Sequence, residues 1–480
     1  MTELIIGVGG NGTHSVLGYL HLCRLLNEPY PRPLKPLDQS ETPGELIIFD
    51  ADKKSNKPDS LCVRFKSIYS YPEENFWIDP NPSYIAKGSK FWAIFSNEPF
   101  LRHLFEENQL DIDIYEGYTG NPPVGATVMY NKIKEEIERP ASGSLEDHFN
   151  IKCDERLNRV IFVGSFIGGT GAGAVPALAR FIKNRSQNVE IVYLAHSDWF
   201  TLESRENNIN TEILKRNVVG GMSFLIKEAE LFKTRVLLDY KEEDMVMRPN
   251  DGPGEQGEKR DFMYLLAGFL IRGFMKTKSL SDGFYGICLN DIDSISSIFD
   301  RFFIKDTYSS QDEFFSLITE ENDTRHNTTN NGNIPTLFGR IKKAYKVYFY
   351  LNYFYKWLSS PAFQYQENPL PDKTEEMIKQ SSDVVKEVLK RATNELKESL
   401  TWLEDLKYPE RFKSFIRLPY RLRDYPESGT LEDIYNYLTG KNILDPGKLA
   451  ESLSIAKDNN VSESLKKKIW ELILKMKEEA

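Results

Sequence analysis

The chain has 480 residues, 40% of them hydrophobic and 28% charged, which by length alone is enough for about three domains with a sizeable core. Its formal net charge of −10 argues against a nucleic-acid-binding protein. Four cysteines without a CxxC pair argue against a zinc knuckle or a disulfide framework and predict a reducing, cytoplasmic compartment.

The sequence shows no signal for secretion, a membrane span or a metal site. The first residues run directly into an apolar strand pattern, so no signal peptide is predicted. The most apolar segment, residues 262–271, is too short to span a bilayer. The six histidines show no metal-binding spacing, so the sequence predicts no metal ligands among the side chains singled out below.

The N-terminal segment reads as strand, glycine loop and helix. Residues 4–6 form a short apolar strand, residues 7–12 read GVGGNG, and a helix is predicted over about 13–26. The glycine spacing fits the G-x-G-x-x-G dinucleotide fingerprint. The candidate ligand-binding residues of this loop are Gly9, Gly10, Asn11 and Gly12.

Two further segments place candidate residues after predicted strands. The strand over 45–49 ends in Asp50 and Asp52, which are candidate ligand contacts or, alternatively, a solvated strand end. A strand predicted near residue 115 leads into Gly120 and Asn121, followed by a helix over about 126–139. The aromatic-rich residues 53–110 and the polar residues 241–260 read as insertions.

The most informative stretch is residues 160–181. An apolar strand over 160–163 is followed by five glycines in ten residues and then by an apolar pattern at helical spacing. Free backbone N–H groups and the positive end of the helix dipole make such a junction an anion site. Glycines let the backbone approach a phosphate closely. The candidate residues are Gly168, Gly169, Thr170, Gly171, Ala172 and Gly173.

These loops resemble those of the tubulin and FtsZ superfamily. GGTGAGAVP at 168–176 resembles its signature loop, with Ile167 in place of the first of three glycines. Residues 7–12 and 50–52 resemble its first and second nucleotide loops, and G-N-P-x-x-G at 120–125 resembles its third. Three glycine loops, each leading into a helix, occur in the order of the family.

The resemblance implies GTP or GDP with Mg²⁺ as the ligands. It implies that residues 168–173 hold the α- and β-phosphates and that Gly120 and Asn121 sense the γ-phosphate. Asp261 would read the guanine or cap its helix, and Glu203 and Asn217 extend the candidate set. Asp291 or Asp293 would orient the attacking water, with Cys288 replacing the first acid of the family's loop at 286–293. That loop is expected on the face opposite the nucleotide, so hydrolysis would require a head-to-tail neighbour.

The expected fold is α/β, with a Rossmann-like, mostly parallel sheet over residues 1–300 and an all-helical domain over 301–480. Helices are predicted at 341–358, 374–406, 430–438, 446–457 and 461–478. The helical domain is expected to hold an unidentified protein partner. The last helix has lysines beside its apolar face, but packing on the body of the protein is favoured over a membrane surface.

The predicted function is a GTP-binding, tubulin- or FtsZ-like protein, with slow or partner-dependent hydrolysis. It would act as a nucleotide-switched polymer or scaffold of the cytoskeletal kind. The resemblance is to prokaryotic families that lack the usual C-terminal domain, and a link to membrane remodelling rests on analogy. Two alternatives stay open: a Rossmann-type enzyme that uses NAD or adenylates a substrate, and a scaffold that binds nucleotide without hydrolysis.

Overall fold

The computed structural model describes residues 2–29, 31–33, 45–51, 61–69, 76–96, 99–115, 117–118, 120–138, 157–197, 201–202, 211–239, 246–247, 262–277, 280, 282–288, 337–359, 372–406 and 418–441. Its strands are β1 (Thr2–Val8), β2 (Arg32–Pro33), β3 (Glu45–Phe49), β4 (Trp77–Ile78), β5 (Leu157–Ser165), β6 (Glu190–His196), β7 (Thr201–Leu202), β8 (Thr234–Asp239), β9 (Val246–Met247) and β10 (Gly283–Cys288).

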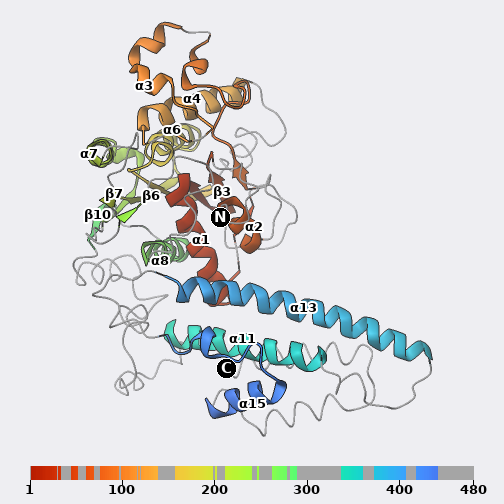
Figure 1. Cartoon of the computed structure of the whole chain (residues 1–480). Coiled ribbons are helices and arrows are strands. Elements are labelled where there is room, and N and C mark those ends of the chain that lie inside the picture. Colours follow the sequence, from red (N-terminus) through yellow and green to blue (C-terminus); the bar gives the residue numbers. More distant parts are fainter. Residues whose placement is uncertain are drawn as a thin grey trace, which may run out of the picture. The chain divides into compact units, whose positions relative to one another are not determined.

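The helices alternate with these strands in the first part of the chain (Figure 1). They are α1 (Gly9–Leu25), α2 (Leu61–Tyr69), α3 (Glu107–Leu110), α4 (Pro122–Glu138), α6 (Gly169–Arg185), α7 (Thr211–Lys227), α8 (Phe262–Lys276), α11 (Leu337–Ser359), α13 (Asp372–Glu404) and α15 (Leu431–Gly440). Short 3-10 turns are η2 (Phe91–Phe95), η3 (Pro99–Leu104), η4 (Ala229–Leu231) and η6 (Leu422–Asp424). No helix in the described part of the chain is long and apolar enough to cross a bilayer.

The chain divides into two compact units, each described separately. The first comprises Met1–Cys23, Pro29–Gln311 and Lys407–Pro409. The second comprises Arg24–Glu28, Asp312–Leu406 and Glu410–Ala480.

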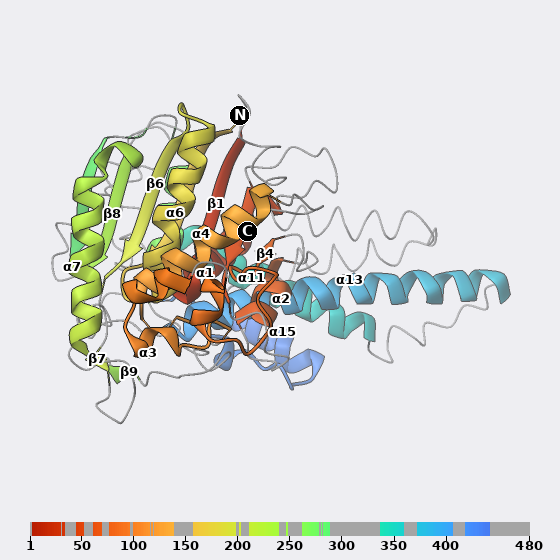
Figure 2. The ribbon, with the colours of Figure 1, turned by 90° about the horizontal axis from the view of Figure 1, so that it is seen from above.

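The first unit is built on one eight-stranded sheet in the order β10-β8-β6-β5-β1-β3-β2, with β4 also paired to β3. Every pair in it is parallel, so the prediction of a mostly parallel α/β sheet is confirmed. Strands β1, β3, β5 and β6 are almost continuously buried, as expected where helices cover both faces of a parallel sheet. Helices α4, α6 and α7 lie on one face and α1, α2 and α8 on the other (Figures 1 and 2).

The strand order reverses beside β1. From β1 the chain first adds β3, β2 and β4 on one side, and then returns to place β5, β6, β8 and β10 on the other. In open α/β sheets ligands bind outside the carboxyl ends of the strands at such a reversal. The carboxyl ends of β1 and β5 are therefore where a ligand site is expected.

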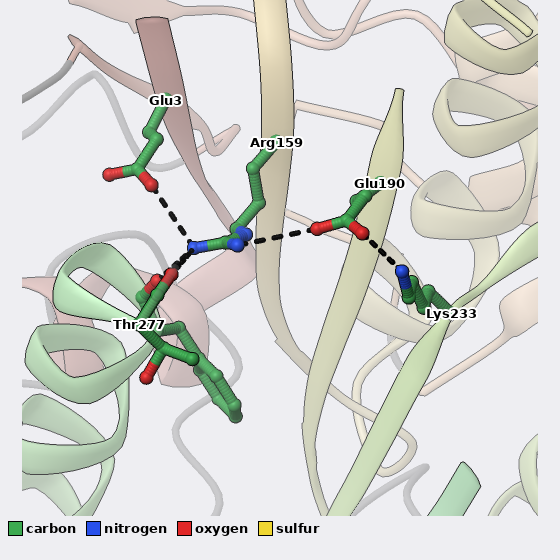
Figure 3. Close-up of polar contacts among 6 residues, drawn as sticks. Glu3, Arg159, Glu190, Lys233 and Thr277 are labelled. Atoms are coloured by element: carbon green, nitrogen blue, oxygen red, sulfur yellow. Dashed lines mark hydrogen bonds and ion pairs between the residues drawn. The ribbon is translucent and has the colours of Figure 1, made fainter. Parts of the chain in front are cut away.

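The amino ends of the strands carry a charged cluster, drawn in Figure 3. The guanidinium of Arg159 on β5 lies between Glu3 on β1 and Glu190 on β6, at 3.1 and 3.3 Å, and Glu190 also pairs with Lys233. Arg159 donates in addition to the backbone oxygens of Phe274 and Thr277 at the end of α8. Arg159 thereby supplies a donor to two carbonyls at the end of α8, where carbonyls lack a partner within the helix itself.

The second unit is helical in its described part. Helices α11 and α13 pack together, and α15 packs on α11. The aromatic face of α11 is buried in a cluster of rings that includes Tyr345, Tyr348, Phe349, Tyr425 and Tyr437. The predicted helices at 446–457 and 461–478 lie outside the described residues.

Candidate functional site

The first glycine loop joins β1 to α1 with no intervening residue. Gly9 is both the first residue of α1 and a residue with a φ of 70°, a conformation that favours glycine. A Cβ on Gly12 would lie 2.3 Å from Val163 O, so this glycine lets α1 pack directly on β5. Gly10 and Asn11 remain partly exposed at the edge of the sheet. The helix starts four residues earlier than predicted, inside the loop.

The second glycine loop joins β5 to α6. Gly168 is the N-cap residue of α6, and the first amide to donate within the helix is that of Ala172, to Gly168 O at 3.1 Å. The amides of Gly169, Thr170 and Gly171 therefore precede the helical hydrogen-bond ladder. Gly168, Thr170 and Ala172 are partly exposed. This is the geometry of an anion-binding helix N-terminus.

The two loops meet. A Cβ on Gly9 would lie 3.3 Å from Gly171 N, and a Cβ on Gly171 would lie 3.3 Å from Val8 O. Because β1 and β5 are adjacent parallel strands, both helix N-termini face the same edge of the sheet. The structure thus brings the two strongest sequence-predicted loops together at the reversal of strand order.

The reason why this stretch needs glycine differs from the one expected. A Cβ on Gly169 would lie 2.7 Å from Tyr118 Cβ, and one on Gly171 would lie 2.8 Å from Ser165 N and O. A Cβ on Gly173 would lie 2.3 Å from Pro122 O, whereas one on Gly168 would meet nothing within 4 Å. Gly169, Gly171 and Gly173 therefore permit close packing on neighbouring strands, loops and α4, whereas the position of Gly168 is open.

The third loop reaches the site without a preceding sheet strand. The strand predicted near residue 115 is wrong, because residues 112–115 form only an isolated antiparallel bridge, Lys90 with Asp113. Gly120 has a φ of 70°, and its backbone oxygen accepts a hydrogen bond from the amide of Asn217 on α7. The same amide approaches Ile167 O at 3.4 Å, so Asn217 ties the second and third loops together.

Asn121 is held by the segment that precedes it. Its side-chain oxygen accepts a hydrogen bond from Gln109 of α3 at 3.3 Å, and its backbone amide donates to Tyr118 O at 2.8 Å. Tyr118 is buried, and burial, with the nearby charges of Asp79 and Asp50, raises the pKa of its hydroxyl well above the usual range. Tyr118 is therefore a neutral hydrogen-bond donor, and it donates to Asn81 at 3.2 Å.

Two aspartates follow neighbouring strands at this edge, and one of them was missed from the sequence. Asp50 follows β3 and Asp79 follows β4, and these strands pair Phe49 with Ile78. The backbone amide of Asp50 donates to Ile78 O at 3.3 Å, and Thr13 of α1 approaches the carboxylate of Asp50 at 3.5 Å. Asp79 was not a candidate because β4 is only two residues long. Within the described residues no group of three or more potential metal-binding side chains occurs.

A buried serine–histidine pair was also missed. Ser15 of α1 and His196, the last residue of β6, are fully buried, with Oγ and Nε2 2.7 Å apart. Burial, with a smaller contribution from His14, lowers the pKa of His196 to about 3. The two residues are 181 positions apart in the chain, so only the fold brings them together.

Five candidates, Asp52, Glu203, Asp261, Asp291 and Asp293, lie outside the described residues. The catalytic loop was expected to begin at Gly286, but Gly286–Cys288 forms the end of strand β10. This strand pairs in parallel with β8. It therefore ends at the edge that carries the glycine loops, and the residues that follow it lie outside the described part of the chain.

No protein-family model matches the chain, and no curated protein matches it. Among solved structures, CetZ from Methanosaeta thermophila strain DSM 6194 aligns with 58% of this chain and 56% of its own, at 13% identity and a TM-score of 0.31. A GTPgS-bound protofilament of CetZ2 from Haloferax volcanii aligns with 50% of this chain and 49% of its own, at 13% identity and a TM-score of 0.27.

The aligned region spans about half the length of these structures, which are tubulin/FtsZ proteins. The parallel sheet, the helices on both of its faces and the glycine loops after β1 and β5 are features of the chain itself. The chain itself therefore has an α/β fold, with an all-parallel main sheet and helices on both of its faces (Figures 1 and 2).

Proposed function

We propose that the chain binds a guanine nucleotide, GTP or GDP, at the carboxyl edge of β1 and β5. One observation carries the proposal: two glycine loops follow these adjacent parallel strands, each opens a helix, and they meet at the reversal of strand order. Each helix N-terminus supplies amides that its own helix does not use. A diphosphate between them would receive hydrogen bonds from both.

Each loop would contact a different part of the nucleotide. The amides of Gly169, Thr170 and Gly171 would hold the α- and β-phosphates, and residues 10–12 would flank them. Gly120 and Asn121 would report on a γ-phosphate, because Asn217 already ties their loop to the second one. The guanine preference rests on the sequence resemblance and is tested below.

Asp50 and Asp79 fit a role as Mg²⁺ ligands. Mg²⁺ prefers oxygen ligands and is commonly held by one or two carboxylates together with substrate phosphates and water. The two aspartates follow neighbouring strands at the edge where the phosphates would lie, and both influence Tyr118 of the third loop. A bound Mg²⁺ would neutralise phosphate charge, and the two carboxylates would orient it.

The output we propose is nucleotide-dependent self-association, with the chain acting as a polymer or scaffold. Hydrolysis by Asp291 or Asp293 belongs to this proposal. The second candidate is a scaffold that binds nucleotide without hydrolysing it, and strand β10 favours it, because it occupies part of the segment where the family has its catalytic loop. Sedimentation of the purified chain with GTP, GDP or no nucleotide tests self-association, and phosphate release separates the two candidates.

The nucleotide itself is tested by denaturing the purified protein and identifying the released compound by chromatography. Recovery of GDP or GTP, and binding of added GDP with Mg²⁺ in preference to ADP, would support the proposal. Recovery of NAD or AMP would support the Rossmann-type enzyme instead. Asp50→Asn and Asp79→Asn should weaken the Mg²⁺ dependence of binding, and binding that is equally Mg²⁺-dependent in both variants would exclude the two carboxylates as ligands.

A further inference from the structure

Asn11, in the first glycine loop, has hydrogen-bond partners at both its backbone oxygen and its side chain. The partners come from α1 and α8, and the one on α1 is itself in contact with β6. Its backbone oxygen lies 2.8 Å from the hydroxyl of Ser15, which in turn lies 2.7 Å from Nε2 of His196. Its side-chain Oδ1 accepts a hydrogen bond from the hydroxyl of Tyr264 on α8, at 2.9 Å. A residue in the first turn of α1 is thereby contacted at both its backbone and its side chain.

The direction of the hydrogen bonds follows from counting protons. The hydroxyl of Ser15 has one hydrogen, and a backbone carbonyl can only accept. Ser15 therefore donates to Asn11 O and accepts from His196, which must carry its proton on Nε2. Burial keeps His196 neutral, since its pKa is lowered to about 3.

The side-chain amide of Asn11 is oriented by Tyr264. The ring of Tyr264 is 2% exposed, stacks on His14 at 4.8 Å and meets His196 edge-on at 6.0 Å, so its hydroxyl has little freedom to move. Because this hydroxyl donates to Oδ1, the N–H groups of Asn11 Nδ2 point away from it. Nδ2 donates to no residue in the described part of the chain, and Asn11 is only partly buried.

The oriented side-chain amide of Asn11 can act as a hydrogen-bond donor to a ligand at this edge of the sheet. The loop that carries it touches the second loop, where the amides of α6 begin. A further N–H donor on the same edge adds to a set of donors that suits an anionic or carbonyl-bearing ligand. In the reversed orientation Oδ1 would face the ligand and repel its oxygens.

We propose that the side-chain amide of Asn11 donates a hydrogen bond to an oxygen of the bound nucleotide, and that Tyr264 is the positioning residue that orients this amide, while Ser15 and His196 lie against its backbone. The assignment rests on the proposed function, because it names a contact within that site. It predicts that Tyr264 affects nucleotide affinity only through Asn11.

A double-mutant cycle tests this prediction. The dissociation constant of GDP with Mg²⁺ is measured by calorimetry for the full-length chain, Asn11→Ala, Tyr264→Phe and the double variant. Tyr264→Phe keeps the ring and its stacking on His14 and removes only the hydroxyl. We expect Asn11→Ala to weaken binding about tenfold and Tyr264→Phe about three- to fivefold, within the net range of a single hydrogen bond. In the Asn11→Ala background, Tyr264→Phe should weaken binding no further.

Asn11→Asp provides a second variant at this partly buried position. It keeps the acceptor for Tyr264 but removes the N–H groups, so it should bind GDP more weakly than Asn11→Ala. Additive effects in the cycle, or wild-type affinity in either Asn11 variant, would overturn the assignment while leaving the proposed function in place. A wild-type chain that binds no guanine nucleotide would instead overturn the proposed function.

Discussion

At the scale of single residues, the neighbouring glycines 220 and 221 on α7 have opposite surroundings. A Cβ on Gly220 would meet nothing within 4 Å, whereas one on Gly221 would lie 2.2 Å from the ring of Phe166. Gly220→Ala should stabilise the protein by about 0.5–1 kcal/mol, because alanine loses less conformational entropy in a helix. Gly221→Ala should destabilise it by about 1–3 kcal/mol through overpacking. Urea denaturation measures both, and equal effects would contradict the packing described for α7.

Also at this scale, Glu3 makes stability depend on pH. Burial outweighs the nearby Arg159 and raises the pKa of Glu3 from 4.5 to about 7. Between these values the folded state holds a proton that the unfolded state has lost, so stability falls as pH rises from 4.5 to 7 and is level above 7. Glu3→Gln removes this dependence. Its stability relative to the wild type should therefore grow with pH by on the order of 2–3 kcal/mol.

The measurement for Glu3 is urea denaturation at pH 5, 6, 7 and 8. Glu190 provides a contrast, because burial there is outweighed by hydrogen bonds from Lys233 and Arg159, and its pKa is lowered. Glu190 therefore contributes stability above its unfolded pKa that is lost as pH falls through the folded value, outside this series. A constant difference between Glu3→Gln and the wild type across the series would show that Glu3 does not titrate as stated.

At the scale of elements, Arg159 joins three strands and the end of α8. Its side chain is 5% exposed and contacts Glu3, Glu190 and two backbone oxygens. Arg159→Lys cannot reproduce the planar fork and would leave buried acceptors without a donor, at a cost of about 3–5 kcal/mol. Arg180→Lys, in a pair whose side chains are 55% and 38% exposed, serves as the control and should change stability by less than about 1 kcal/mol.

The elements near the site were predictable where the signal was local. A buried apolar run followed by glycines and a helical pattern identifies β1 with α1 and β5 with α6, because each signal lies within about twenty residues. The strand predicted near residue 115 failed because the alternation in residues 111–115 occurs in a short irregular segment. Strand β10 was missed because residues 286–288 were read through the family's loop rather than through their own apolar, aromatic composition.

The site residues that escaped prediction depend on distant pairing. Asp79 is identified only once β4 is known to lie beside β3. His196 and Ser15 carry no motif, and their contact exists because β6 ends where α1 begins its second turn. Asn217, by contrast, was a candidate from the resemblance. Its side-chain amide contacts the backbone oxygens of Gly120 and Ile167, in the third and second loops.

At the scale of the whole molecule, two units with separate cores should unfold in two transitions, because cooperativity is usually confined to a compact unit. GDP with Mg²⁺ would bind the first unit only. At a concentration 100 times its dissociation constant it should stabilise that unit by about 2.7 kcal/mol and leave the other transition in place. Differential scanning calorimetry with and without GDP checks this. A single transition, or equal shifts of two, would mean that the units unfold together.

The contact between α4 and α6 gives the molecule a stiff connection that leads away from the glycine loops. Gly125 and Gly173 let the two helices interlock so closely that a Cβ on Gly125 would lie 2.2 Å from Gly169 O. Val124 and Val128 of α4 in turn belong to the apolar cluster around Phe91 and Ile114. At these two positions backbone meets backbone, so a shift of one helix would displace the other. If the proposed nucleotide binds at the start of α6, α4 and its apolar cluster would form the path along which such a shift reaches the rest of the unit.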